Sequence, residues 1–223
     1  MRENIYFRIM SVECVIFDMD GTLIDSRIDI TNAVNFVRSK KGLPPLKIDD
    51  VVAAINGPVS ELSLKFYNTA KYEKRDKKLF EEFYMEECTK NAKVYNGVID
   101  VLEYLKTKNK RLAVATNAPT KFAEKMLKSA NICHYFDCIK GCDGDLPPKP
   151  HPHILLYLLE KLNYKDKNRS LFIGDNESDF LAALSANLNY IMVTWGFGKN
   201  NSVIKCKFIV NYPEEVLKYI DME

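Results

Sequence analysis

The hydrophobic pattern of the chain alternates between short apolar runs and longer segments with helical spacing. The run from Cys14 to Phe17 has no polar alternation, which is typical of a strand buried on both faces of a parallel sheet. Further short runs predict strands at residues 111–115, 136–140, 170–173, 190–193 and 208–210. Because helical segments separate these runs, the pattern predicts an α/β fold with a doubly wound parallel sheet and right-handed crossovers.

Helical periodicity accounts for most of the chain between the predicted strands. From Ile28 to Val37 apolar residues recur every three or four positions, and the glycine and prolines of residues 42–45 end that helix. The same spacing predicts helices at residues 48–55, 60–70, 76–91, 99–105, 121–130, 153–162, 179–186 and 214–220. Residues 1–10 are interpreted as a short strand or a frayed end.

The helices before residue 92 predict a separate domain. Between residues 26 and 92 the pattern predicts no strand, whereas a crossover between parallel strands needs only one helix. We therefore expect residues 26–92 to form a helical cap inserted into an α/β core of residues 1–25 and 93–223.

Composition narrows the possible partners and location. The chain has 223 residues, 47% of them apolar and 28% charged, which is ordinary for a globular domain with an insert. Its net charge of +2 gives no electrostatic reason to bind nucleic acid or an anionic membrane. No segment has the length of a membrane span, the start lacks the apolar stretch of a signal peptide, and the six cysteines are scattered. We therefore expect a cytoplasmic protein with reduced thiols and with neither a nucleic-acid nor a membrane partner.

The strongest chemical signal directly follows the first predicted strand, where Asp18 and Asp20 are separated by one residue and precede Gly21 and Thr22. Two acids this close repel each other when ionised, unless a cation lies between them or one keeps a proton. In open α/β sheets, ligands bind at the carboxyl ends of the strands. Taken alone, the residues Asp18 to Thr22 are explained equally well by an ordinary Asp-Gly turn at the end of a strand.

Polar residues follow other predicted strands too. Thr116 and Asn117 follow one strand, Lys149 lies in a proline-rich loop, and Asp175 follows another strand, with Asp179 at the start of a helix. Singly, each has an ordinary explanation as a strand end, a surface lysine or a helix cap. Together at one sheet edge, carboxylates without His or Cys suit Mg²⁺, while a hydroxyl and an ammonium suit a phosphoryl group. The set therefore predicts magnesium-dependent phosphoryl chemistry.

In this order the residues resemble the four motifs of the haloacid dehalogenase superfamily of phosphohydrolases. The matches are residues 18–22, Thr116-Asn117, Lys149-Pro150 and residues 174–179. The resemblance covers nearly the whole chain, and the predicted helical insert resembles the small cap of that superfamily. The acid at position 20 favours phosphoryl transfer over dehalogenation, because dehalogenase relatives lack an acid there.

The resemblance implies a role for each matched residue. Asp18 would be the nucleophile that forms an aspartyl-phosphate, and Asp20 would act as general acid and then as general base. The residues implied as metal ligands for Mg²⁺ are Asp18, Asp20 through its backbone carbonyl, Asp175 and Asp179, the last supporting the waters of the metal. The residues implied to bind phosphate are Gly21, Thr22, Thr116, Asn117 and Lys149.

Within the superfamily, the chain is most similar to bacterial phosphoglycolate phosphatases. The similarity lies in residues 25–35, 42–45, 149–152 and 174–198. Asn96, Ala118 and Asn187 depart from the Pro, Lys and Gly that are usual at these positions. These departures leave the catalytic set intact and the substrate open, because the cap largely selects the substrate.

Two other classes of protein stay open. Sugar-phosphate mutases share the fold and the four motifs, although this chain lacks a His in the first cap helix and an Arg in the loop of residues 56–61. A receiver-type signalling domain, which holds a phosphoryl group as a signal, would not carry the helical insert. A non-catalytic interaction protein of this fold is a further alternative, although such proteins tend to lose an acid and here all of the acids are present. We therefore expect an enzyme, a phosphatase that acts on a small phosphorylated metabolite such as 2-phosphoglycolate, with Mg²⁺ as cofactor and as a monomer or homodimer.

Overall fold

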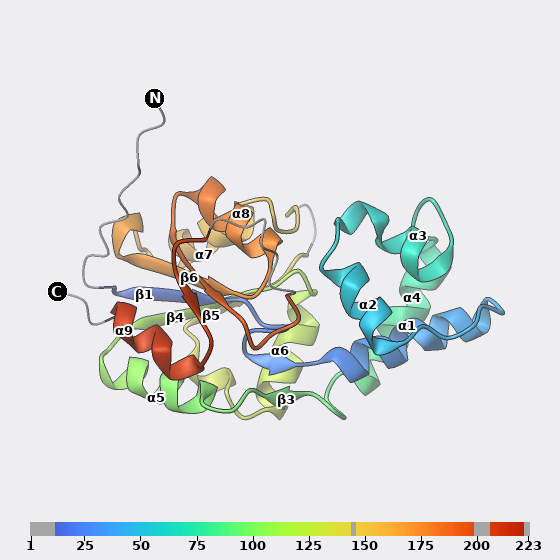
Figure 1. Ribbon diagram of the computed structural model, residues 1–223, viewed down its shortest axis with the longest axis horizontal. Coiled ribbons are helices and arrows are strands. Elements are labelled where there is room, and N and C mark those ends of the chain that lie inside the picture. Colours follow the sequence, from blue (N-terminus) through green and yellow to red (C-terminus); the bar gives the residue numbers. More distant parts are fainter. Residues whose placement is uncertain (1–11, 144–145, 199–205, 221–223) are drawn as a thin grey trace. The chain divides into compact units, whose positions relative to one another are not determined.

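The computed structural model describes residues 12–143, 146–198 and 206–220, which form two compact units (Figure 1). Unit 2 comprises Ile24–Lys93, and unit 1 comprises the chain up to Leu23 and from Val94 onward. The expected lead-in at residues 1–10 lies outside the described residues. None of the helices in the described ranges has both the length and the apolar character needed to cross a bilayer.

Unit 1 is built on a six-stranded parallel sheet with the strand order β5-β4-β1-β6-β7-β8. The strands are β1 (Cys14–Phe17), β4 (Arg111–Ala115), β5 (Cys138–Lys140), β6 (Ser170–Gly174), β7 (Asn189–Val193) and β8 (Ile209–Val210). Every residue of β1, β6 and β7 is buried, which explains their uninterrupted apolar runs. The predicted α/β fold with a parallel sheet is confirmed.

Helices cover both faces of this sheet. They are α5 (Val98–Thr107), α6 (Thr120–Ser129), α7 (His153–Lys161), α8 (Glu177–Ala186) and α9 (Leu217–Ile220), with short 3₁₀ turns at Cys133–Tyr135, Lys167–Arg169 and Pro213–Val216. In Figure 1, α7 and α8 lie on one side of the sheet, whereas α5 and α9 lie on the other. One core cluster packs Leu155 and Leu158 of α7 and Ala182 of α8 against Ile16 and Phe172 of the sheet. The sheet is thus buried between two helical layers.

Several helices of both units are followed by asparagine in the left-handed conformation. Asn131 after α6 has φ 55°, and Asn187 after α8 has φ 58°. Asparagine tolerates this conformation better than other side chains and can replace the glycine that usually ends a helix. The departure from Gly at Asn187 therefore leaves the end of α8 intact.

Unit 2 is helical, with a two-stranded ribbon at its ends. Its elements are β2 (Ile24–Asp25), α1 (Arg27–Lys40), α2 (Ile48–Ile55), a 3₁₀ turn (Val59–Glu61), α3 (Leu62–Tyr67), α4 (Lys74–Glu87) and the first residue of β3 (Lys93–Val94), which crosses the boundary to unit 1. Val34 and Val37 of α1 pack with Val51, Phe66 and Tyr67 in one apolar cluster. The pairing of β2 with β3 was not predicted, because strands of two residues are too short to show a period.

The register of the sheet places the carboxyl ends of β1, β4 and β6 side by side at one edge of the sheet. Phe17, the last residue of β1, pairs with Val114 of β4 and with Ile173 of β6. The chain leaves β1 toward β4 on one side and later returns to β6 on the other side. Such a switch point is where ligands bind in open α/β sheets, so the residues that follow these three strands are placed to form a site.

Candidate active site

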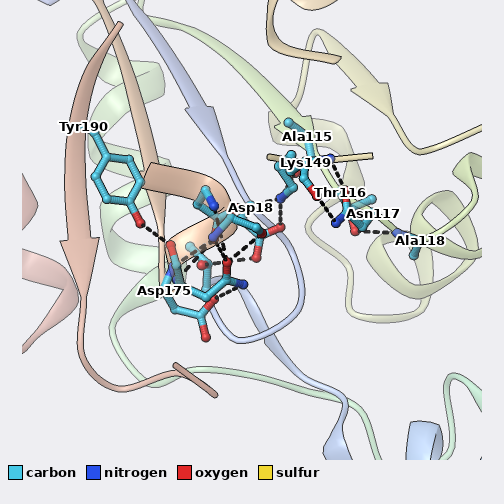
Figure 2. Close-up of polar contacts among 12 residues, drawn as sticks. Asp18, Ala115, Thr116, Asn117, Ala118, Lys149, Asp175 and Tyr190 are labelled. Carbon is cyan, nitrogen blue, oxygen red and sulfur yellow. Dashed lines mark hydrogen bonds and ion pairs between the residues drawn. The ribbon is translucent and has the colours of Figure 1, made fainter. Parts of the chain in front are cut away.

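The centre of the site is an ion pair between Asp18 and Lys149. Asp18 follows β1 and is 4% exposed, and its Oδ1 lies 2.5 Å from Nζ of Lys149, which is 2% exposed. The same Nζ donates to the backbone carbonyl of Ala115 at 2.9 Å and lies 2.7 Å from Oδ1 of Asp179. Figure 2 shows the side chains of Asp18 and Lys149 pointing toward each other. A buried ammonium is thus held directly beside the expected nucleophile.

Asn117 holds the main chain of Lys149 in place. Its Oδ1 accepts a hydrogen bond from the backbone N–H of Lys149 at 2.7 Å, and its Nδ2 donates to the carbonyl of Lys149 at 3.1 Å (Figure 2). The neighbouring Thr116 is buried, and its Oγ1 accepts a hydrogen bond from the N–H of Ala118 at 3.1 Å. The amide of Asn117 therefore contacts the protein itself, which the sequence did not indicate.

Asp179 is oriented by the start of α8. The side chain of Asn176 accepts hydrogen bonds from the N–H groups of Ser178 and Asp179, and Oδ2 of Asp179 accepts from the N–H groups of Asp175 and Asn176. This reciprocal arrangement is a capping box. It uses one carboxylate oxygen of Asp179 for the cap and directs the other toward Lys149.

Asp175 is held by a loop that follows β7. Its Oδ2 accepts hydrogen bonds from the backbone N–H groups of Phe197 at 2.6 Å and Gly198 at 2.8 Å. Gly21 approaches the same oxygen from the turn after β1, and a Cβ at position 21 would lie only 2.3 Å from it. Gly21 also has a φ of +91°, which favours glycine. Residues 195–198 follow a strand at the ligand-binding edge of the sheet, so their position in the sequence was a usable signal for a place beside the site.

Three carboxylates form a compact acidic group. Oxygens of Asp18, Asp175 and Asp179 lie within 4.8 Å of one another, and all three residues are buried. Burial, together with repulsion from the neighbouring carboxylates, raises the pKa of Asp18 well above its ordinary value and that of Asp175 to about 7. Burial alone would lower the pKa of Lys149, but the charges of Asp179 and Asp18 raise it, so this side chain stays charged. The group can hold a metal ion, and hard carboxylate oxygens fit Mg²⁺.

The remaining expected residues surround this centre. Thr22 is buried, and its hydroxyl lies 3.5 Å from Oδ2 of Asp18. Asp20 is partly exposed. His151 and His153, beside Lys149 in the sequence, are exposed, and their rings contact each other edge to face. The structure thus brings Asp18, Thr22, Lys149, Asp175 and Asp179 into one connected group.

Comparisons with known proteins identify the family of this chain. The family model described as haloacid dehalogenase-like hydrolase matches residues 15–193. A phosphoglycolate phosphatase from Aquifex aeolicus is 33% identical over 93% of this chain and 96% of its own length, and one from Pasteurella multocida is 32% identical over 86% and 89%.

Solved structures give the same result. The crystal structure of a predicted phosphoglycolate phosphatase from Haemophilus somnus superposes with a TM-score of 0.83 at 28% identity, covering 94% of this chain and 98% of that one. A predicted phosphatase from Clostridium acetobutylicum superposes with a TM-score of 0.80 at 30% identity, covering 95% and 99%. The resemblance inferred from the sequence motifs is confirmed, and this chain belongs to the haloacid dehalogenase-like hydrolase family.

Proposed function

We propose that this protein is a Mg²⁺-dependent phosphatase that hydrolyses a small organic phosphate monoester through an aspartyl-phosphate on Asp18. The observation that carries the proposal is the buried contact of Asp18 with the Lys149 ammonium, inside a group of three carboxylates. A carboxylate nucleophile, a fixed positive charge and a cation site are the parts that phosphoryl transfer needs. The names of the relatives, phosphoglycolate phosphatase in both cases, support the same reaction class.

The first half-reaction transfers the phosphoryl group to Asp18. A carboxylate oxygen of Asp18 forms a bond to phosphorus as the bond from phosphorus to the ester oxygen breaks. Asp20 donates its proton to that leaving oxygen, so the product leaves as a neutral alcohol. Lys149 stabilises the negative charge on the phosphoryl oxygens, and Asn117 keeps the lysine in place through its main chain.

The second half-reaction releases inorganic phosphate. Asp20, now ionised, accepts a proton from a water molecule that attacks the phosphorus of the aspartyl-phosphate. The bond between phosphorus and the oxygen of Asp18 breaks, and the carboxylate of Asp18 is restored. Thr116 and the backbone N–H groups of Gly21 and Thr22 are proposed to bind the phosphoryl oxygens in both steps.

The acidic group suits a divalent cation by its chemistry. Asp18, Asp175 and the backbone carbonyl of Asp20 would hold Mg²⁺, and Asp179 would support its waters. When bound, the cation would lower the pKa values of Asp18 and Asp175 and offset the negative charge of the phosphate. Burial first, and repulsion from the neighbouring carboxylates second, raise the pKa of both carboxyl groups, and a bound cation would offset both effects.

The substrate proposed is 2-phosphoglycolate or a close analogue, acted on by a cytoplasmic monomer or homodimer. The relatives named phosphoglycolate phosphatase carry this part of the proposal. Unit 2 is proposed to act as the cap that selects the substrate and excludes water during the reaction.

Phosphate release from a panel of small phosphate esters, including 2-phosphoglycolate, tests the proposal with Mg²⁺ and with EDTA. The expected result is metal-dependent release that is strongest on 2-phosphoglycolate and is abolished in Asp18→Asn. Asp100→Asn, at an exposed position of α5, is the matched control and should keep wild-type turnover. Release spread over sugar phosphates would refute the named substrate, and isomerisation of a sugar phosphate without release would favour a mutase. Full activity of Asp18→Asn would refute the nucleophile.

A further inference from the structure

The loop Trp195-Gly196-Phe197-Gly198 contacts the acidic group without contributing a charge to it. Its N–H groups at Phe197 and Gly198 both donate to Oδ2 of Asp175, at 2.6 and 2.8 Å. Two donors on one oxygen fix the plane and rotation of this carboxylate. The loop follows β7, the neighbour of β6, so the sheet register places it beside Asp175.

The loop is also attached to the turn that carries the nucleophile. Nε1 of the Trp195 indole donates to the backbone carbonyl of Thr22 at 3.1 Å, and Thr22 lies four residues after Asp18. Trp195 and Thr22 line a small apolar pocket together with Phe17 and Val98, so the indole is packed as well as hydrogen-bonded. The residues after β1, β6 and β7 are therefore connected through this loop.

The packing at Gly196 leaves no room for a side chain. A Cβ there would lie 2.0 Å from the carbonyl oxygen of Gly21 and 2.5 Å from Oδ2 of Asp175. Oδ2 of Asp175 is thus enclosed between the turn at Gly21 and the loop at Gly196. A loop that fits this closely can hold the carboxylate in only one orientation.

We infer that Trp195 and Gly196 are positioning residues, which hold the carboxylate of Asp175 in the orientation that binds the metal ion of the proposed phosphatase. The inference rests on the proposed function and deepens it, because it assigns metal affinity to a loop that supplies no ligand. Backbone donors fix one oxygen of Asp175, and the indole ties these donors to the turn of Asp18. Groups that orient a metal ligand in this way typically change metal affinity about 10- to 100-fold when they are removed.

The test measures Mg²⁺ binding by calorimetry, without substrate, in wild type, Gly196→Ala and Trp195→Phe. Gly196→Ala displaces the loop by its Cβ, and we expect about 10- to 100-fold weaker Mg²⁺ binding. Trp195→Phe keeps an aromatic ring and loses only the indole N–H, so a smaller weakening is expected, up to about 10-fold for one hydrogen bond. This second variant provides the test if Gly196→Ala fails to fold.

Two controls separate positioning from general destabilisation. Gly42→Ala places an alanine at a backbone φ of +67° in unit 2, where its Cβ would meet no described atom within 4 Å. Because this conformation is unfavourable for alanine, the variant should be less stable, but it should keep the Mg²⁺ affinity of wild type. Trp195 is the single tryptophan of the chain, so its fluorescence reports on this loop alone. In Gly196→Ala the emission maximum should move to longer wavelength while the far-ultraviolet circular dichroism stays unchanged.

Each outcome decides the inference. Weaker Mg²⁺ binding in both variants, with phosphate release recovering toward wild type at saturating Mg²⁺, supports it. Wild-type Mg²⁺ affinity in Gly196→Ala and Trp195→Phe overturns it, whether or not the tryptophan emission moves, and leaves the phosphatase proposal intact as long as wild type hydrolyses its ester. A wild-type protein that binds no Mg²⁺ overturns both proposals.

Discussion

Replacing Asp175 with asparagine should stabilise the metal-free protein at neutral pH while removing its response to Mg²⁺. Asp175 is buried beside Asp18 and Asp179, and Oδ2 already accepts two backbone hydrogen bonds. The side-chain oxygen of asparagine can accept the same two bonds. The substitution therefore removes a buried negative charge with little change in shape.

The magnitude follows from the pKa of Asp175, which burial raises from 3.8 to about 7. Between these values the folded protein binds more protons at this carboxyl than the unfolded chain does. The free energy of unfolding therefore falls as the pH rises from about 4 to about 7. At about 1.4 kcal/mol for each pKa unit, the ionised carboxylate costs about 4 kcal/mol of stability above pH 7. Asp175→Asn should remove this cost, and its advantage should vanish near pH 4.

Urea unfolding in EDTA at pH 4 and pH 8 measures this difference, with Asp100→Asn as the matched control on the surface of α5. The control should change the free energy of unfolding by less than about 1 kcal/mol, because its carboxylate is exposed near a helix start. Adding Mg²⁺ at pH 8 should stabilise wild type and leave Asp175→Asn unchanged. If Asp175→Asn were no more stable than wild type at pH 8 in EDTA, the reasoning that burial and repulsion make the ionised carboxylate of Asp175 unfavourable would be refuted.

Two further substitutions test how the chain is held in each unit. Buried Asp29 of α1 accepts hydrogen bonds from both the N–H and the side-chain amide of Asn91 and from the N–H of Ala92. Asp29→Ala should lower the free energy of unfolding, measured in urea, by about 3 kcal/mol, because it leaves these donors without an acceptor. A loss below about 1 kcal/mol would contradict this reasoning. Asn117→Ala should lower phosphate release about 100-fold by misplacing Lys149. Release at the wild-type rate would exclude the role of Asn117 in holding the main chain of Lys149.

Local patterns in the sequence were sufficient for most of the secondary structure. Strands buried on both faces need uninterrupted apolar residues, and helices need apolar positions every three or four residues, so both leave a readable signal. The helix Ile48–Ile55 and the strand Arg111–Ala115 have the predicted bounds. The ribbon of β2 and β3 left no such signal, because its pairing joins two-residue segments far apart in the chain.

Sequence also indicated where a site could form, because parallel strands place the residues after their carboxyl ends at one edge of the sheet. That rule, together with the resemblance of Lys149-Pro150 and residues 174–179 to the motifs of the family, was enough to nominate Asp18, Lys149, Asp175 and Asp179 as a group. It could not assign the role of Asn117, because its partners are backbone atoms of Lys149, 32 residues away. A side chain that binds a main chain leaves no complementary residue type to find in the sequence.

Residue types and their periodicity therefore determined the fold class and the candidate acids, since both depend on properties that repeat locally along the chain. Only the tertiary structure decided how these acids are oriented. The indole of Trp195 meets Thr22 across 173 residues, and Lys149 meets Asp18 across 131. Such contacts depend on the register of strands and the path of loops, where differences of an ångström decide whether a hydrogen bond forms.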